Sequence, residues 1–142
     1  MSSIIEFFVA PDDAVATSVA KDGPGPDLKP ATYGNFDVWS TLAEWESILL
    51  DRDLDEVIDA GGPDVLSDGD GPLVLLVPPP LTKALAQLRD DTLANVVERW
   101  IALRAEDDEE IEDELAHDLI GELAALSADA ERTRGALYCW IC

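Results

Sequence analysis

The segment from Ser3 to Ala10 reads Ser-Ile-Ile-Glu-Phe-Phe-Val-Ala and is the clearest structural signal in the chain. Its β-branched and aromatic residues favour a strand, and its apolarity is nearly continuous instead of alternating. A second segment of this kind, from Ala136 to Cys142, closes the sequence. Strands of this composition usually lie centrally in a sheet that helices cover. The two ends of the chain therefore predict the middle of a small sheet.

The residues between these two segments predict one more strand and several helices. Leu73 to Val77 is short and fully apolar, and prolines bound it on both sides, which favours a strand. Elsewhere, apolar residues recur at helical spacing behind residues that cap helices. The expected helices cover residues 14–20, 36–50, 81–88, 93–105 and 108–134, with a short turn over 51–60. Gly135 is expected to end the last helix.

These elements predict one α+β domain that spans residues 1–142. We expect a small sheet of about three strands (N-terminal, central and C-terminal) packed with roughly four to five helices. A chain of 142 residues suits a single compact domain and is long enough to bury a core without disulfides. The segments 22–30 and 63–72 are rich in glycine and proline and predict loops too short to divide the chain.

The charge of the chain limits its partners. It holds 31 acidic and 9 basic residues, which gives a formal net charge of −22. Nucleic-acid backbones and anionic membranes are bound by lysine and arginine, so we expect neither as a direct partner. The first residues combine a short apolar run with an acid and lack a basic region. They make a poor signal peptide, so a cytoplasmic protein is expected.

Five features follow one another in a recognisable order. They are the opening Ile4-Ile5-Glu6-Phe7-Phe8, a loop ending at Phe36-Asp37, a helix from Val38 to Leu50 with two tryptophans, a short strand before Leu81 to Leu88, and a last helix that leads into an apolar strand after Arg134-Gly135. This order resembles the YfbM-like family of uncharacterised bacterial proteins over most of the chain. The resemblance implies a fold and a bacterial source. It implies no activity, because none is established for that family.

The chain ends on Cys139-Trp140-Ile141-Cys142, which has the C-x-x-C spacing of redox and metal sites. A redox pair needs its nucleophilic thiol at a helix N-terminus, whereas this pair lies in a predicted strand. Cysteines three residues apart in a strand point to opposite faces with Cα atoms roughly 10 Å apart, too far for a disulfide. His117 is the only histidine, so a zinc site would lack ligands. We expect two unpaired thiols.

Other cofactor motifs fail on their spacing. Asp51, Asp53 and Asp55 match the first three ligands of an EF-hand loop, but the glycine and glutamate required further along are missing. The turn over 68–71, Asp-Gly-Asp-Gly, has too few acids to enclose a cation. No glycine-rich phosphate loop occurs. We therefore expect no cofactor.

The strongest candidate for function is the segment 107–114, which we call the acidic run. Seven of its eight residues are acidic: Asp107, Asp108, Glu109, Glu110, Glu112, Asp113 and Glu114. Acids at a helix start are favoured by the helix dipole, and a general acidity can reflect a salty environment. Our first hypothesis is a non-enzymatic protein-interaction module that binds a basic partner, as an immunity protein or a DNA mimic does. A housekeeping domain whose acidity is only environmental is one alternative.

The other alternative is a small-molecule binder or small enzyme with a pocket near Tyr33, Trp39 and His117. Tyr33 and Trp39 flank the loop over 22–30, and the other tryptophans are expected in the core. His117 lies among acids and about 200° around the predicted helix from the apolar stripe that includes Leu115. A carboxylate would orient it as a general base, but no G-x-S-x-G turn supplies a nucleophile. We expect no enzyme, and we leave open a homodimer through an edge strand.

Overall fold

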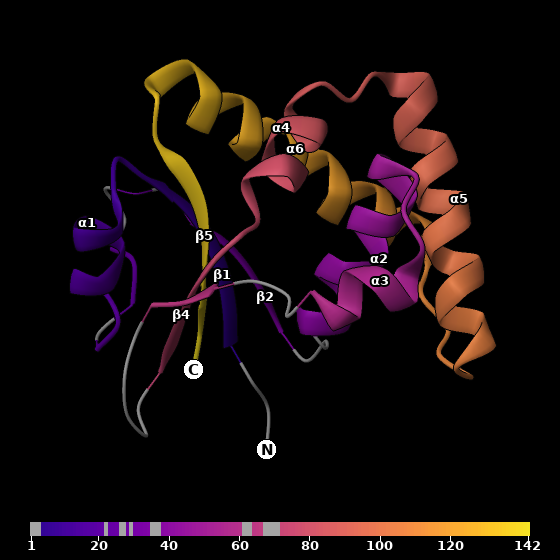
Figure 1. Cartoon of the computed structure of the whole chain (residues 1–142), viewed down its shortest axis with the longest axis horizontal. Coiled ribbons are helices and arrows are strands. Elements are labelled where there is room, and N and C mark those ends of the chain that lie inside the picture. Colours follow the sequence, from indigo (N-terminus) through magenta and orange to yellow (C-terminus); the bar gives the residue numbers. More distant parts are fainter. Residues whose placement is uncertain are drawn as a thin grey trace.

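The two terminal segments form the middle of an antiparallel sheet. We analysed a computed structural model, which describes residues 4–21, 23–25, 28, 30–34, 38–60, 64–66 and 72–142. Within these residues the sheet has five strands in the order β2-β1-β5-β4-β3 (Figure 1). The strands are β1 (Ile4–Ala10), β2 (Ala31–Gly34), β3 (Asp64–Val65), β4 (Leu73–Leu76) and β5 (Ala136–Ile141). The α+β class and the central position of β1 and β5 are confirmed.

Strands β1 and β5 pair from Ile5 opposite Ile141 to Ala10 opposite Ala136. Because successive side chains in a strand point to opposite faces, their continuous apolarity supplies both faces of the sheet. Phe7 belongs to a large core on one face, and Phe8 belongs to a smaller core on the other. Both rings are fully buried. The expectation that helices cover strands of this composition is therefore confirmed.

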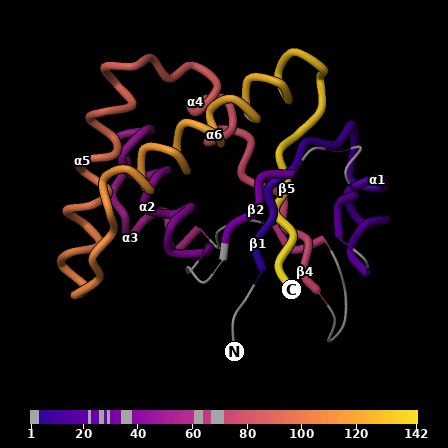
Figure 2. Tube along the Cα trace, turned by 180° about the vertical axis from the view of Figure 1, so that it is seen from behind, coloured from indigo at the N-terminus to yellow at the C-terminus, as the bar shows by residue number. Residues whose placement is uncertain are grey.

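Helices cover the two faces unequally. Of the described helices, α1 (Asp13–Ser18) alone lies on the side of the smaller core, together with the chain around Ala20 and Leu28. Figures 1 and 2 both show the other helices on the opposite side of the sheet. They are α2 (Val38–Leu50), α3 (Leu54–Asp59), α4 (Pro79–Ala86), α5 (Asp90–Glu106) and α6 (Asp113–Thr133). Helix α6 contacts the central strands β1 and β5, α5 packs against α6, and α2 packs against α4 and α5.

The counts of about three strands and four to five helices are too low. The described residues contain five strands and six helices. The two strands that the sequence did not predict lie at the edges of the sheet and are short. Strand β2 has only four residues, and both residues of β3 are exposed. An edge strand needs no apolar pattern on both faces, so these segments carried little signal.

The last long helix is shorter than predicted at its N-terminus. It begins at Asp113 instead of Asp108, because Asp108 has a left-handed backbone with φ of 61° and interrupts the helical path. At the other end, Arg134 adopts the left-handed capping conformation that was expected of Gly135. Gly135 is needed for a different reason. A Cβ atom at this position would lie 2.5 Å from the backbone oxygen of Ala10.

Replacing Gly135 with alanine should lower the free energy of unfolding by about 1–3 kcal/mol, because the backbone near Ala10 must move to admit the methyl group. The same replacement at Gly121, inside α6, should raise it by about 0.5–1 kcal/mol, since alanine is the better helix former. There the new Cβ meets only the side chain of Leu93, at 3.8 Å. Urea unfolding of both variants measures the two effects. An unchanged or higher free energy of unfolding in the Gly135 variant would contradict the close approach at that position.

Candidate functional site

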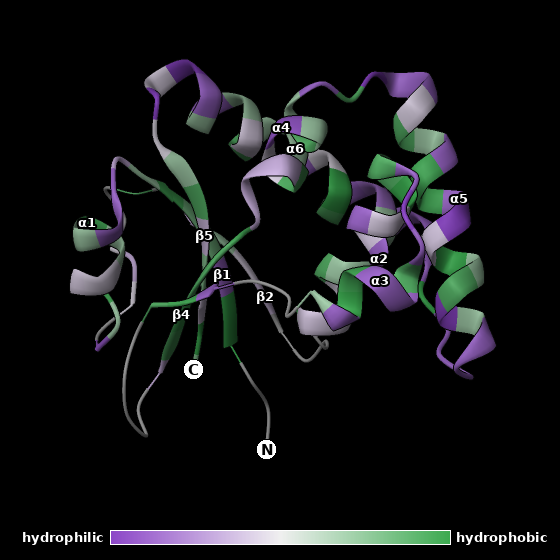
Figure 3. Cartoon of the chain, viewed as in Figure 1, coloured by the Kyte–Doolittle hydropathy of each residue, from purple (hydrophilic) through white to green (hydrophobic). Residues whose placement is uncertain are grey.

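The acidic run forms the link between α5 and α6. Asp107 caps the end of α5, Glu112 precedes α6, and Asp113 and Glu114 form its first turn. All seven acidic side chains are exposed. The end of α5 that leads into the link is hydrophilic (Figure 3). The run is thus a turn followed by a helix start, where carboxylates also complement the helix dipole.

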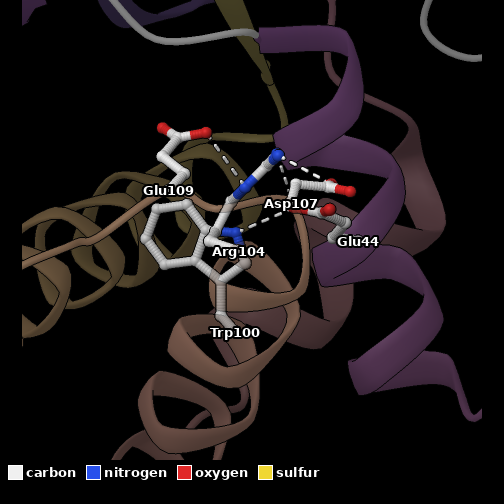
Figure 4. A network of polar contacts seen from close by, with 5 residues as sticks. All are labelled: Glu44, Trp100, Arg104, Asp107 and Glu109. Atoms are coloured by element: carbon white, nitrogen blue, oxygen red, sulfur yellow. Dashed lines mark hydrogen bonds and ion pairs between the residues drawn. The ribbon is translucent and has the colours of Figure 1, made fainter.

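Arg104, on the last turn of α5, holds this link in place (Figure 4). Its Nη2 lies 3.0 Å from Oδ2 of Asp107, and its Nε lies 3.3 Å from Oε2 of Glu109. The Arg104 carbonyl oxygen also accepts hydrogen bonds of 3.0 Å from the backbone N–H groups of Asp107 and Glu109. One residue therefore binds the link through both its side chain and its backbone. This fixes the path on which the acidic run leaves α5.

The same guanidinium is paired on its inner side with Glu44 of α2. Arg104 Nη1 lies 3.2 Å from Glu44 Oε1, and Trp100 donates its indole N–H to that oxygen over 3.1 Å. Glu44, Trp100 and Arg104 are each less than 10% exposed. Burial raises the pKa of the Glu44 carboxyl above its ordinary value, while the charge of Arg104 and the Trp100 hydrogen bond oppose that rise. The network thus joins the acidic run to the core.

Its parts were not predicted from the sequence. Glu44 and Arg104 are 60 positions apart in the chain, so no local pattern links them. A weak signal exists in the spacing of Trp100 and Arg104, which lie four residues apart and hence on one face of α5. The core positions expected for Trp45 and Trp100 are confirmed. Their rings pack edge to face at a centroid distance of 5.3 Å.

The network divides the acidic run into two groups. Asp107 and Glu109 are paired with Arg104. The remaining carboxylates make no ion pair within the described part of the chain. They are Asp108, Glu110, Glu112, Asp113 and Glu114. One guanidinium faces three carboxylates, so the network itself also carries an excess of negative charge.

A hollow of about 290 Å³ lies beside the network, between α2, α3 and the end of α5. We call it the α2–α3 hollow. Most of its lining is apolar, and Glu44 and Asp107 add two carboxylates. The lining residues are Trp39, Ser40, Ala43, Glu44, Leu54, Ile58 and Asp107. Two of them, Trp39 and Ile58, keep 41% and 57% of their surface exposed, which is high for large apolar residues.

Of the three residues predicted to share a pocket, only Trp39 lines the α2–α3 hollow. Tyr33 lies on β2, and its hydroxyl donates a hydrogen bond of 2.6 Å to Glu122 of α6. Burial and that neighbouring carboxylate raise the pKa of the tyrosine. His117 lies on α6 and is half-buried, although the predicted apolar stripe through Leu115 placed it on the other side of the helix. The reason is a rotated apolar stripe: Ala116 is buried and Leu115 is 51% exposed.

The two cysteines are unpaired, as predicted. Cys139 is buried in the large core, and Cys142 is exposed. Burial raises the pKa of the Cys139 thiol, which is the opposite of what a redox nucleophile requires.

Metal ligands do not gather in the described part of the chain. No group of three or more histidine, cysteine or acidic side chains there is arranged to hold an ion. Asp53, one of the EF-hand candidates, instead caps α3 by accepting a hydrogen bond from the N–H of Asp55. The Asp-Gly-Asp-Gly turn over 68–71 lies outside the described residues.

Comparisons of the chain with protein families, with curated proteins and with solved structures find no match. The resemblance to the YfbM-like family therefore stays a prediction. Among the helices of the described residues, none combines the length and apolarity required to cross a membrane. The assignment of the candidate site therefore rests on the geometry of the described residues alone.

Proposed function

We propose that this protein is a non-enzymatic interaction module that binds a basic partner protein through the acidic run. The observation that carries the proposal is the attachment of the run to Arg104. A turn whose acids serve only solvation needs no buried arginine to fix its path. Here Arg104 is 7% exposed and holds the link at Asp107 and Glu109. A pre-ordered charged surface loses less conformational entropy on binding than a mobile one.

Electrostatics also support this function. The free carboxylates of the run belong to a chain with a net charge of −22. A field of one sign steers an oppositely charged partner and raises the association rate by about 10- to 1,000-fold at low salt. Such a field repels nucleic acid and anionic membranes, so a basic protein is the partner that fits. A cytoplasmic location, a bacterial source and a homodimer stay predictions.

The proposal is tested with a neutralised bait. Four exposed acids of the run are replaced, while Asp107 and Glu109 stay to hold Arg104. The replacements are Asp108→Asn, Glu110→Gln, Glu112→Gln and Glu114→Gln. Asparagine tolerates the left-handed conformation at position 108. A control bait carries the same change in charge at exposed acids elsewhere, through Asp64→Asn, Asp90→Asn, Glu98→Gln and Glu131→Gln. Thermal unfolding checks that both baits are folded.

Each bait is used for a pull-down from lysate of the source organism, with mass spectrometry as the readout. The original chain and the control bait should capture the same basic protein, and the neutralised bait should lose it. With that partner purified, stopped-flow mixing should give an association rate lower by about tenfold or more, with a weaker salt dependence. If no basic protein is captured, or if all baits capture it equally, the acidity is environmental and the proposal fails.

A further inference from the structure

The α2–α3 hollow combines an exposed apolar wall with two carboxylates, that of the buried Glu44 and that of the exposed Asp107. We propose that it binds one basic side chain, an arginine, of the partner protein. This inference rests on the proposed function and assigns the contact that anchors the partner.

The walls suit the stem of a long side chain. Trp39 and Ile58 leave apolar surface in contact with solvent, while the other large tryptophans of the chain are buried. The methylene groups of an arginine bury themselves well on such surface. Its planar guanidinium also stacks on aromatic faces, which the strongly hydrated ammonium of lysine does less well. The exposed indole of Trp39 therefore favours arginine.

The charges that line the hollow favour a cation. Glu44 and Asp107 line it, and none of the described residues in its lining is basic. Arg104 neutralises only part of this charge, because it also contacts Glu109. An incoming guanidinium would meet uncompensated negative charge in a partly buried place, where electrostatic attraction is stronger than in water. A carboxylate would be repelled there, and an uncharged side chain would gain only apolar contact.

The volume of the hollow and its position beside the acidic run both fit a single anchoring side chain. A volume of about 290 Å³ is at the lower end of the range for small-molecule pockets. Asp107 belongs both to the hollow and to the acidic run, so the two surfaces are continuous. A basic protein that approaches the run would bring its side chains to the mouth of the hollow. At protein interfaces, arginine is enriched among the few anchoring side chains that fill pockets shielded from water.

The first test uses small probes and the intact protein. Nα-acetyl-arginine methylamide is titrated while NMR follows the indole N–H signal of Trp39. The citrulline analogue, equal in shape and uncharged, and the leucine analogue serve as controls. We expect a saturable shift with the arginine probe and binding of citrulline weaker by about tenfold or more. Equal shifts with leucine, or none with arginine, would overturn the proposal.

The second test uses a matched pair of variants. Ile58→Lys places a competing cation at the hollow, and Ile4→Lys makes the same chemical change at an isoleucine of β1 that is 49% exposed and does not line the hollow. Ile58→Lys should weaken arginine binding by about tenfold, and Ile4→Lys should leave it unchanged. If both variants keep their affinity, the hollow is not the anchor. A basic partner that is captured through the acidic run but binds Ile58→Lys normally would leave the proposed function intact and overturn this inference alone.

Discussion

Replacing Arg104 with methionine should lower the free energy of unfolding by about 3–5 kcal/mol. Methionine keeps much of the volume of the side chain but removes its charge. Glu44 then stays buried. Of its two hydrogen-bond donors within the described residues, the Trp100 indole is the one that remains. Breaking a buried pair by removing one partner is costly because it leaves a charge without compensation. Urea unfolding at neutral pH measures the loss.

The loss should depend on pH. Burial already holds the pKa of Glu44 above its ordinary value, and removing Arg104 raises that pKa further. A carboxyl whose pKa is higher in the folded state than in the unfolded state binds more protons when folded, so stability falls as the pH rises between the two pKa values. The free energies of unfolding of the variant and the original protein should therefore be closest at a pH below about 4.3, the pKa of glutamate in the unfolded chain. The full difference should appear at a pH above the pKa of Glu44 in the folded variant.

Two controls separate this cause from a general loss of packing. The double variant Arg104→Met with Glu44→Gln removes the orphaned charge and should recover most of the loss. Arg52→Met breaks the ion pair of Arg52 with Glu46, in which the arginine is 55% exposed, and should change the free energy of unfolding by less than about 1 kcal/mol. A loss in Arg104→Met no larger than that in Arg52→Met would show that the network does not stabilise the fold.

Arg104 also marks the limit of what the sequence could predict. The terminal strands were predicted because their signal is local: each is a run of apolar residues with no alternation. The signal that identified the acidic run was equally local, because seven acids lie within eight consecutive residues. The break at Asp108 was not, because it depends on contacts that Arg104 makes at once with the link and with Glu44 of α2. The sequence pattern therefore predicted a helix from residue 108, although tertiary contacts hold the residues before Asp113 in a non-helical link.

The α2–α3 hollow shows the same limit for the candidate site. Trp39 was singled out because it stands near a loop, and the structure does place it at a hollow. Its partners in that hollow are Ile58 of α3 and Asp107 at the end of α5. No short-range pattern in the sequence specifies how these two elements pack against each other. Tyr33 and His117 were grouped with Trp39 by residue chemistry, whereas their contacts depend on which strand and which turn of α6 they occupy.

Truncating Phe7 or Phe8 should also cause a large loss of stability. The two residues are adjacent in β1, so their side chains lie on opposite faces of the sheet. Each ring is 0% exposed. Phe7 belongs to the large core with residues of α6, and Phe8 stacks on Tyr138 at a centroid distance of 5.7 Å in the core beside α1. Truncating a buried phenylalanine removes its transfer free energy and leaves a cavity. Phe7→Ala and Phe8→Ala should each lower the free energy of unfolding by about 3–5 kcal/mol.

Comparing the two variants shows whether both faces of the sheet are covered equally firmly. Helix α1 has only six residues, so by itself it could cover its face loosely. Two hydrogen bonds attach α1 and the residues after it to β5: Tyr138 donates its hydroxyl to Asp13 over 2.7 Å, and Trp140 donates its indole N–H to the carbonyl of Ala20 over 2.8 Å. A loss below about 1 kcal/mol for Phe8→Ala, beside a full loss for Phe7→Ala, would mean that this face opens readily. Similar losses would show that the continuous apolarity of β1 reflects two closed cores.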